Sequence, residues 1–243
     1  MRSMKEQRLL ALIPAKAAST RLKRKNAHLL DGEALVSRAV RCAREAGVFA
    51  DIVVSTEDPE IAQLARDAGA SVPFVRPPEL SIDPAGVVEV TLHALDELES
   101  QGKQYRTVII LLPTSPFRTP DDIHEALRIY DKEGVQFLMS VGTYEHTPLA
   151  ALIYKDGLLT PLLPDYLTRT GAKAKESTPV TRRANGAVTI CDVERFRQER
   201  TYYAYPLAAY DMPWDRSIDI DTQADIVLAE FLLRKEKAGR YDR

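Results

Sequence analysis

The sequence predicts an α/β fold in which a mainly parallel sheet is covered by helices on both faces. Short apolar segments of strand length alternate with longer amphipathic segments along most of the 243 residues. The apolar segments are almost continuously hydrophobic, which is typical of parallel strands buried on both sides. The alternation itself is typical of a Rossmann-like, doubly wound sheet, in which helices connect successive strands.

Five segments are predicted as strands because each is short, apolar and followed by polar or turn-forming residues. In chain order they are LLALIP (9–14), DIVVST (51–56), TVIILLP (107–113), FLMSVG (137–142) and GAVTI (186–190). The amphipathic segments between and after them predict helices over 32–47, 59–69, 87–100, 120–134 and 222–237. Thr119-Pro120 followed by two aspartates is a typical helix start, and Thr222 is the expected cap of the last helix.

Residues 143–185 interrupt this alternation. They include PLLPDY and then the polar, basic stretch TRTGAKAKESTPVTRR, which has no long apolar period. We expect one domain over residues 1–243, with 143–185 inserted as a flap, a dimerisation arm or a mobile loop.

Composition excludes several classes of protein. The net charge of −2 leaves no general basic face, so nucleic acid is not an expected partner. Apolar runs such as VIILL (108–112) are too short to cross a membrane. Cys42 and Cys191 stand in apolar segments without metal or redox spacing, so they are expected in the core. We therefore expect a reduced, cytoplasmic protein.

The stretch LIPAKAASTRLKRKN (12–26) ends a predicted strand in a loop that carries five cations. In open α/β sheets, ligands bind beyond the carboxyl ends of the strands. Small side chains let backbone N–H groups approach an anion, and the cations neutralise it, so a polyphosphate is a natural ligand. The spacing matches neither a Walker loop nor the GxGxxG fingerprint. A solvated basic loop is the alternative reading.

Three further stretches contain candidate site residues. In IDIDTQAD (218–225), Asp219 and Asp221 alternate along a predicted extended segment, so both carboxylates face one side. Two carboxylates on one side can hold Mg²⁺. In the alternative reading, Asp221 belongs only to a turn and a helix cap. In LLPTSPFRTP (111–120), hydroxyls on a proline-stiffened loop suit a polyol or carboxylate ligand, and a structural turn is equally compatible. Arg76 in VRPPEL (75–80) begins a proline-fixed loop after a strand, where an isolated arginine is often a surface residue.

Taken together, these stretches resemble the cytidylyltransferases that activate acidic sugars, the CMP-sialic acid synthetase family. The resemblance covers roughly residues 9–234. It rests on IPAKAASTRLKRKN, VVSTEDPEIAQLARDAGASVPFVRPPEL, LLPTSPFRTPDDI, RANGAVTI and SIDIDTQADIVLAE, in this order.

The resemblance implies transfer of CMP from CTP to the anomeric hydroxyl of an ulosonic acid, with release of pyrophosphate. It implies a nucleotide site of Lys16, Ser19, Arg21, Asn26 and Arg76, and catalytic residues Lys25, Asp219 and Asp221, of which the two aspartates bind Mg²⁺. Thr114, Ser115, Asn185, Tyr202 and Tyr203 would contact the sugar acid. Residues 143–185 would form the dimerisation segment of a homodimer and complete the partner's site.

Four positions depart from the family pattern. Lys16 replaces a usual arginine, and Ala17-Ala18 replaces a frequent Gly-Gly. On the sugar side, Leu112 replaces a glutamine and Thr189 replaces a tyrosine. We therefore expect an acceptor other than N-acetylneuraminic acid, such as legionaminic, pseudaminic or another deoxy-ulosonic acid. Two alternatives remain: a nucleotidyltransferase for a neutral sugar 1-phosphate, and a non-catalytic nucleotide-binding relative.

Overall fold

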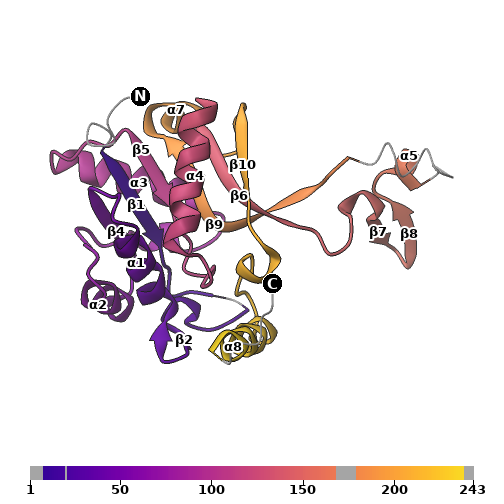
Figure 1. The fold of residues 1–243 in the computed structure, drawn as a ribbon, viewed down its shortest axis with the longest axis horizontal. Helices are drawn as coiled ribbons and strands as arrows, with labels where there is room; N and C mark the ends of the chain where they lie inside the picture. The colour runs from indigo at the N-terminus through magenta and orange to yellow at the C-terminus, as the bar shows by residue number, and fades with distance from the viewer. Residues whose placement is uncertain (1–7, 20, 168–178, 238–243) are drawn as a thin grey trace.

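The computed structural model describes residues 8–19, 21–167 and 179–237, and it has the α/β fold that the sequence predicts (Figure 1). Six strands form one sheet in the order β10-β6-β9-β5-β1-β4. Their bounds are β1 Leu9–Pro14, β4 Asp51–Ser55, β5 Thr107–Ile110, β6 Phe137–Thr143, β9 Arg182–Asp192 and β10 Leu207–Asp211. β1 pairs in parallel with β4 and β5, and β10 pairs in parallel with β6.

The strand β9 differs from the parallel strand that was expected at GAVTI within a mainly parallel sheet. It pairs antiparallel with both β5 and β6, and at 11 residues it is longer than the predicted GAVTI segment. Continuous apolarity shows that a strand is buried on both faces, but it does not reveal the strand's direction. The half-buried edge strand β10 has no strong apolar run and was not predicted.

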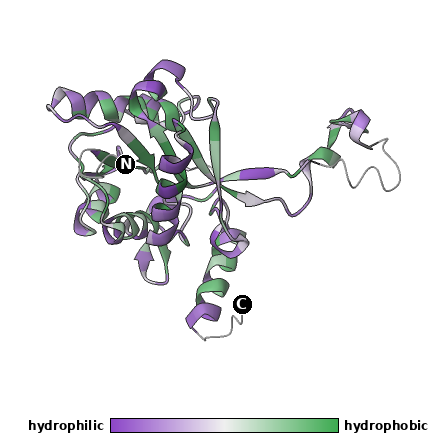
Figure 2. Ribbon diagram, turned by 45° about the horizontal axis from the view of Figure 1, so that its top comes forward, coloured by the Kyte–Doolittle hydropathy of each residue, from purple (hydrophilic) through white to green (hydrophobic). Residues whose placement is uncertain are grey.

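Helices cover both faces of the sheet, whose strands are the most apolar part of the fold (Figure 2). One buried cluster joins the sheet to α1 (Leu35–Ala46), α2 (Pro59–Asp67) and α4 (Pro120–Glu133). A second cluster joins the opposite face to α3 (Val87–Ser100) and α7 (Val193–Glu199). The helix predicted over 32–47 begins only at Leu35, because Glu33–Ala34 form the strand β3, which pairs with β2 (Leu29–Leu30) in a small hairpin. The last helix, α8 (Gln223–Lys237), packs through a third, smaller cluster.

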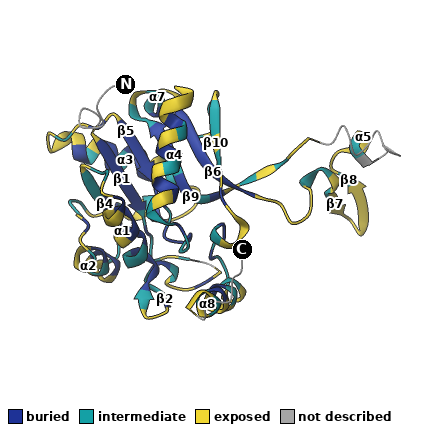
Figure 3. Ribbon diagram, in the orientation of Figure 1, coloured by how far each residue is buried: buried dark blue, intermediate teal, exposed yellow. Residues whose placement is uncertain are grey.

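An arm extends from the body of the protein at the end of β6 (Figure 1). It contains the antiparallel pair β7 (Leu152–Lys155) and β8 (Leu158–Pro161) and the short helix α5 (Pro164–Leu167). Nearly all of its residues are exposed (Figure 3). The arm accounts for the first part of the predicted insertion 143–185, and residues 168–178 lie outside the described part of the chain.

The core also contains both cysteines, as predicted. Cys42 and Cys191 are buried and not bonded to each other. None of the helices in the described ranges has the length and apolar character needed to cross a membrane.

Asp122 is a buried carboxylate that fastens the start of α4 to the edge of the sheet. It accepts hydrogen bonds from the Tyr210 hydroxyl at 2.7 Å and from Arg216 Nη2 at 2.9 Å. The Thr119 N–H also donates to it at 2.8 Å, which completes a capping box. Burial raises the pKa of Asp122, but the bonds from Arg216, Tyr210 and Thr119 outweigh burial and hold that pKa below its usual value.

We expect Asp122→Asn to lower the free energy of unfolding by about 2–3 kcal/mol, less than the full cost of breaking a buried pair because Arg216 stays one-third exposed. Because the folded-state pKa of Asp122 is lowered, its stabilisation is present above about pH 4 and is lost as the pH falls further. Urea unfolding between pH 2.5 and 7 would measure both effects. Asp131→Asn, at an exposed position of the same helix, is the control, and equal losses in the two variants would contradict the prediction.

Candidate active site

Predicted site residues gather at the carboxyl ends of β1, β4 and β5. The loop after β1 supplies cations, and residues 217–221 return to it from near the end of the chain. Lys25 Nζ lies 2.7 Å from Asp221 Oδ1, and Arg21 Nη2 lies 2.7 Å from Oδ2 of the same carboxylate. The fold therefore joins two predicted site segments that are 196 residues apart in sequence.

The cationic loop is held by its own side chains. Asn26 is buried, and its Nδ2 donates to the Lys16 carbonyl at 2.8 Å, so this asparagine closes the loop. Lys25 then begins a short 3₁₀ turn, Lys25–Ala27. Lys16 remains partly exposed, 4.0 Å from an oxygen of the exposed Asp83, and Ser19 is also partly exposed. The loop thus leaves several polar groups accessible to an anion.

Glu57, directly after β4, is a site residue that the sequence analysis missed. Its Oε1 accepts the Ala17 N–H at 2.8 Å, and its Oε2 accepts the Ser81 hydroxyl at 2.7 Å. Arg76 Nη1 lies 4.0 Å from the same carboxylate. Glu57 therefore ties the cationic loop to two other segments. Its place at the carboxyl end of a predicted strand was a signal that could have identified it.

Arg76 lies beside this carboxylate but is almost completely buried, with 2% of its surface exposed. Its Nε donates to the Ser55 hydroxyl at 3.2 Å, and its Nη2 donates to the Ser55 carbonyl. Burial lowers the pKa of Arg76 to about 10, with Glu57 opposing that shift. The guanidinium is still charged at neutral pH and adds positive potential beneath the loop.

Asp219 and Asp221 lie in an irregular segment rather than in the extended strand that their alternation predicted. Both still face the loop. Burial raises the pKa of Asp219, and Asp221 adds to the rise, whereas a hydrogen bond from Thr114 and the charge of Lys25 oppose it. Among the described residues, the buried Oδ1 of Asp219 has no hydrogen-bond partner.

An unpartnered, desolvated carboxylate oxygen is suited to a hard cation such as Mg²⁺. Within the described ranges no group of three His, Cys, Asp or Glu side chains forms a complete metal site. Mg²⁺ usually keeps water and binds through one or two carboxylates together with substrate phosphates. The pair Asp219 and Asp221 fits that incomplete, substrate-assisted type of site.

Thr114 and Ser115 follow β5 next to the carboxylate pair. Both are buried, and the Ser115 hydroxyl donates to the Asn185 carbonyl at 3.0 Å. The Thr114 carbonyl accepts the Ile220 N–H at 2.8 Å. The loop after β5 is therefore attached directly to the segment that carries Asp219.

Leu112 and Thr189 lie on one face of the sheet. Thr189 is paired in register with Ile110, and side chains two residues apart on a strand point to the same side. Both Leu112 and Thr189 are half-buried. Gly186, at a φ of +71°, lies directly against Leu112, since a Cβ there would approach Leu112 Cδ1 to 2.7 Å. This surface is apolar at Leu112 and carries only a small hydroxyl at Thr189.

The remaining predicted sugar contacts, Asn185, Tyr202 and Tyr203, differ in their surroundings. Asn185 is 1% exposed and points into the protein. Tyr202 and Tyr203 follow α7 and precede β10, whose first residue pairs with Phe137 at the start of β6. Tyr202 packs against the same apolar cluster as Leu112, and the centroid of the Tyr203 ring lies 4.9 Å from that of Tyr202. Arg118, in the loop after β5, is buried and donates to the carbonyls of Leu112 and Ala187.

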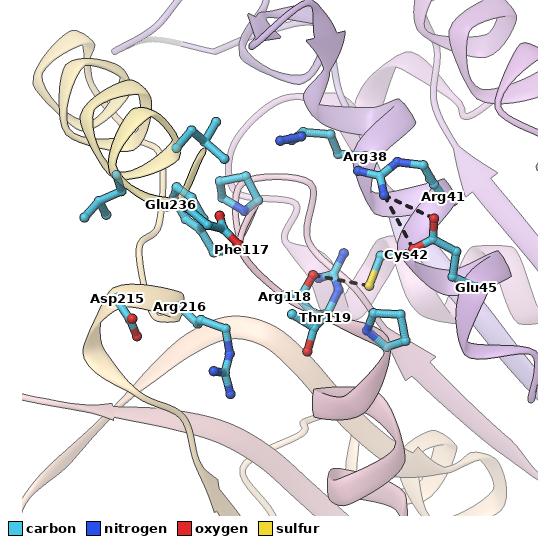
Figure 4. Close-up of a pocket in the computed structure, with 14 residues that line it drawn as sticks. Arg38, Arg41, Cys42, Glu45, Phe117, Arg118, Thr119, Asp215, Arg216 and Glu236 are labelled. Carbon is cyan, nitrogen blue, oxygen red and sulfur yellow. Dashed lines mark hydrogen bonds and ion pairs between the residues drawn. The ribbon is translucent and has the colours of Figure 1, made fainter. Parts of the chain in front are cut away.

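A separate cavity of about 590 Å³ lies between α1, α8 and residues 116–120 (Figure 4). Its arginines are largely neutralised. Arg41 bonds to Glu33 and Glu45, and Arg216 bonds to the buried Asp122. Arg118 lines this cavity but already donates to two backbone carbonyls, and Lys25, Asp219 and Asp221 do not line it, so we do not assign the candidate chemistry to it.

Comparison with known proteins agrees with this geometry. The model of the cytidylyltransferase family matches residues 10–236. CMP-N,N'-diacetyllegionaminic acid synthase of Legionella pneumophila is 32% identical over 228 residues, which cover 93% of this chain and 96% of that protein. N-acylneuraminate cytidylyltransferase of Escherichia coli is 29% identical over 241 residues, which cover 97% of this chain and 54% of that protein.

A solved structure of similar fold is that of a CMP:2-keto-3-deoxy-manno-octonic acid synthetase complexed with CTP. It superposes with a TM-score of 0.66 at 14% sequence identity, covering 94% of this chain and 99% of that one. At this identity the likeness supports the fold alone.

Proposed function

This chain belongs to the cytidylyltransferase family, and we propose that it transfers CMP from CTP to the anomeric hydroxyl of a sialic-acid-like ulosonic acid, releasing pyrophosphate. The observation that carries the proposal is the convergence of Lys25 and Arg21 on Asp221, beside the unpartnered oxygen of Asp219. The similarity to the legionaminic acid enzyme supports an acidic sugar as acceptor.

In this reaction the acceptor hydroxyl attacks the α-phosphorus of CTP, and the bond to pyrophosphate breaks. The chain must disperse the charge that develops on the departing pyrophosphate. Lys25 and Arg21 lie where they can bind phosphate oxygens, and Lys16 adds charge at the other end of the loop. The proton of the hydroxyl passes to solvent water as the new oxygen–phosphorus bond forms, and no strong side-chain base is required.

We propose Mg²⁺ as the cofactor, held by Asp219 and Asp221 together with phosphate oxygens of CTP. When bound, it would neutralise phosphate charge and lower the pKa of the attacking hydroxyl. The desolvated Asp219 carboxylate supports this assignment because it has an unused oxygen among the described residues.

The acceptor is proposed to be a deoxy-ulosonic acid rather than N-acetylneuraminic acid. Leu112 and Thr189 present an apolar and a small side chain on the face next to Thr114 and Ser115. Such a surface favours a sugar with a methyl or acylamino group at that point over one with a free hydroxyl, whose desolvation would not be compensated.

We expect Leu112→Gln to raise kcat/KM for N-acetylneuraminic acid about tenfold relative to a legionaminic acid, because the amide supplies the missing polar contact. Steady-state kinetics with both acids would measure this ratio. Leu112→Met, which keeps an apolar side chain of similar volume, is the matched control. A wild-type enzyme that already prefers N-acetylneuraminic acid would contradict the prediction.

The proposed reaction is tested by measuring pyrophosphate release from CTP and Mg²⁺ across a panel of ulosonic acids, with a no-acceptor control. We expect release with one deoxy-ulosonic acid and with CTP but not UTP. Release with a neutral sugar 1-phosphate would favour the alternative nucleotidyltransferase. Binding of CTP without turnover of any acceptor would favour the non-catalytic reading.

We also propose a homodimer formed through the arm of β7, β8 and α5. Its apolar side chains are strongly exposed, and such patches mark interaction surfaces. They are Leu152, Ile153, Tyr154, Leu158, Leu159, Leu162 and Leu163. A second copy is the proposed partner because the family resemblance implies that residues 143–185 form the dimerisation segment of a homodimer.

We expect the double variant Leu158→Asp, Leu159→Asp to be monomeric by light scattering, whereas the wild-type chain is dimeric. Its Tm should change little apart from the loss of dimerisation, because both leucines are more than 60% exposed in the protomer. Lys155→Gln, in the same hairpin, should remain dimeric. A monomeric wild-type chain would refute the proposed interface.

A further inference from the structure

Asn185 has no hydrogen-bonding capacity left for a substrate. Its Oδ1 accepts the Ser140 hydroxyl at 2.6 Å and the Ala187 N–H at 3.2 Å. Its Nδ2 donates to the Ser217 hydroxyl at 3.0 Å and to Met212 Sδ at 3.3 Å. An asparagine side chain has two acceptor and two donor positions, so all four are used. A sugar contact would require one of these buried bonds to break.

The bond to Ser217 connects Asn185 to the segment that carries the carboxylates. Ser217 is 2% exposed and stands two residues before Asp219. It packs on Gly142 of β6, where a Cβ would approach the Ser217 hydroxyl oxygen to 3.0 Å. Arg183 Nη2 also donates to the Ser217 carbonyl at 3.1 Å. This end of the 217–221 segment is therefore fixed by close packing and by side chains of β9.

The backbone of Asn185 holds the neighbouring loop at the same time. Its carbonyl accepts the Ser115 hydroxyl, and the next residue of that loop toward β5, Thr114, bonds to both Ile220 and Asp219. One residue of β9 thus links the acceptor-side loop and the carboxylate segment, neither of which is a regular element of the sheet.

We propose that Asn185 is a positioning residue, which acts through Ser217 to place Asp219 for binding of CTP with Mg²⁺, and that it does not contact the acceptor. This inference rests on the proposed function of the site. It assigns Asn185 to the nucleotide and metal half of the reaction, in contrast to the sugar contact that the family resemblance implies.

The test compares Asn185→Ala with Ser217→Ala, which removes only the hydroxyl that accepts the Asn185 amide. Calorimetry would measure CTP binding in the presence of Mg²⁺ without acceptor, and kinetics would measure the acceptor KM. Both variants should bind CTP about tenfold more weakly and need more Mg²⁺ for half-maximal rate, with the acceptor KM unchanged within twofold. Thr91→Val, which removes a similarly buried hydroxyl in α3, should leave all three quantities unchanged.

A tenfold higher acceptor KM in Asn185→Ala, with normal CTP binding in both variants, would overturn the inference. Wild-type values of CTP affinity, Mg²⁺ requirement and acceptor KM in both variants would overturn it as well. If Asn185→Ala does not fold, Ser217→Ala decides alone. The outcome is separable from the proposed function, because a wild-type protein inactive toward every ulosonic acid would refute the reaction while the calorimetric comparison still tests Asn185.

Discussion

Asp219→Asn is expected to lower kcat by about a thousandfold, corresponding to about 4 kcal/mol of lost charge stabilisation in the transition state. The substitution keeps the shape of the side chain and removes the charge whose Oδ1 is unpartnered among the described residues. Pyrophosphate release at saturating CTP and acceptor, titrated with Mg²⁺, would measure the loss.

The same substitution should not destabilise the fold. Burial raises the pKa of Asp219, so its ionised form is disfavoured in the folded state and opposes stability at neutral pH. We therefore expect Asp219→Asn to have a Tm equal to or above that of the wild type. Asp215→Asn, at an exposed position in the 3₁₀ turn Trp214–Arg216, which precedes the segment 217–221, should be neutral in both assays. Activity within tenfold of wild type would exclude Asp219 from the proposed metal site.

Lys25→Met is expected to lower kcat/KM for CTP by about 10²–10³-fold, because the variant keeps the length of the side chain but loses a charge proposed to bind phosphate. The side chain of Lys25 is only 16% exposed and lies 2.7 Å from Asp221, so its charge acts in a partly desolvated site.

Lys23→Met is the matched control, since it makes the same change in the same loop at an exposed position. We expect its kcat/KM to stay within twofold of wild type. Equal losses in the two variants would mean that the loop acts through its total charge rather than through Lys25, and the assigned catalytic role would be wrong. The loss at Lys25 should persist at 0.5 M salt, where exposed charges are largely screened.

Most regular elements of this protein follow from local sequence. The predicted strands 9–14, 51–56 and 137–142 agree with β1, β4 and β6 to within one residue. The Thr119-Pro120 start of α4 is observed as a capping box. These features depend on apolar periodicity and capping, which involve residues a few positions apart. The family could also be inferred from the sequence, because its motifs are contiguous stretches.

Other features depend on contacts between distant segments and were decided by the tertiary structure. β9 runs antiparallel to both of its neighbours, and Ser217, at the start of the irregular segment 217–221, packs against Gly142. The Ala17 N–H donates to the Glu57 carboxylate and so joins two loops that are 40 residues apart in sequence. Asn185 was expected to contact the acceptor sugar, but four protein groups occupy the hydrogen-bonding positions of its side chain. Hydrogen bonds and burial of this kind join residues far apart in the chain, and no local pattern encodes which pairs will meet.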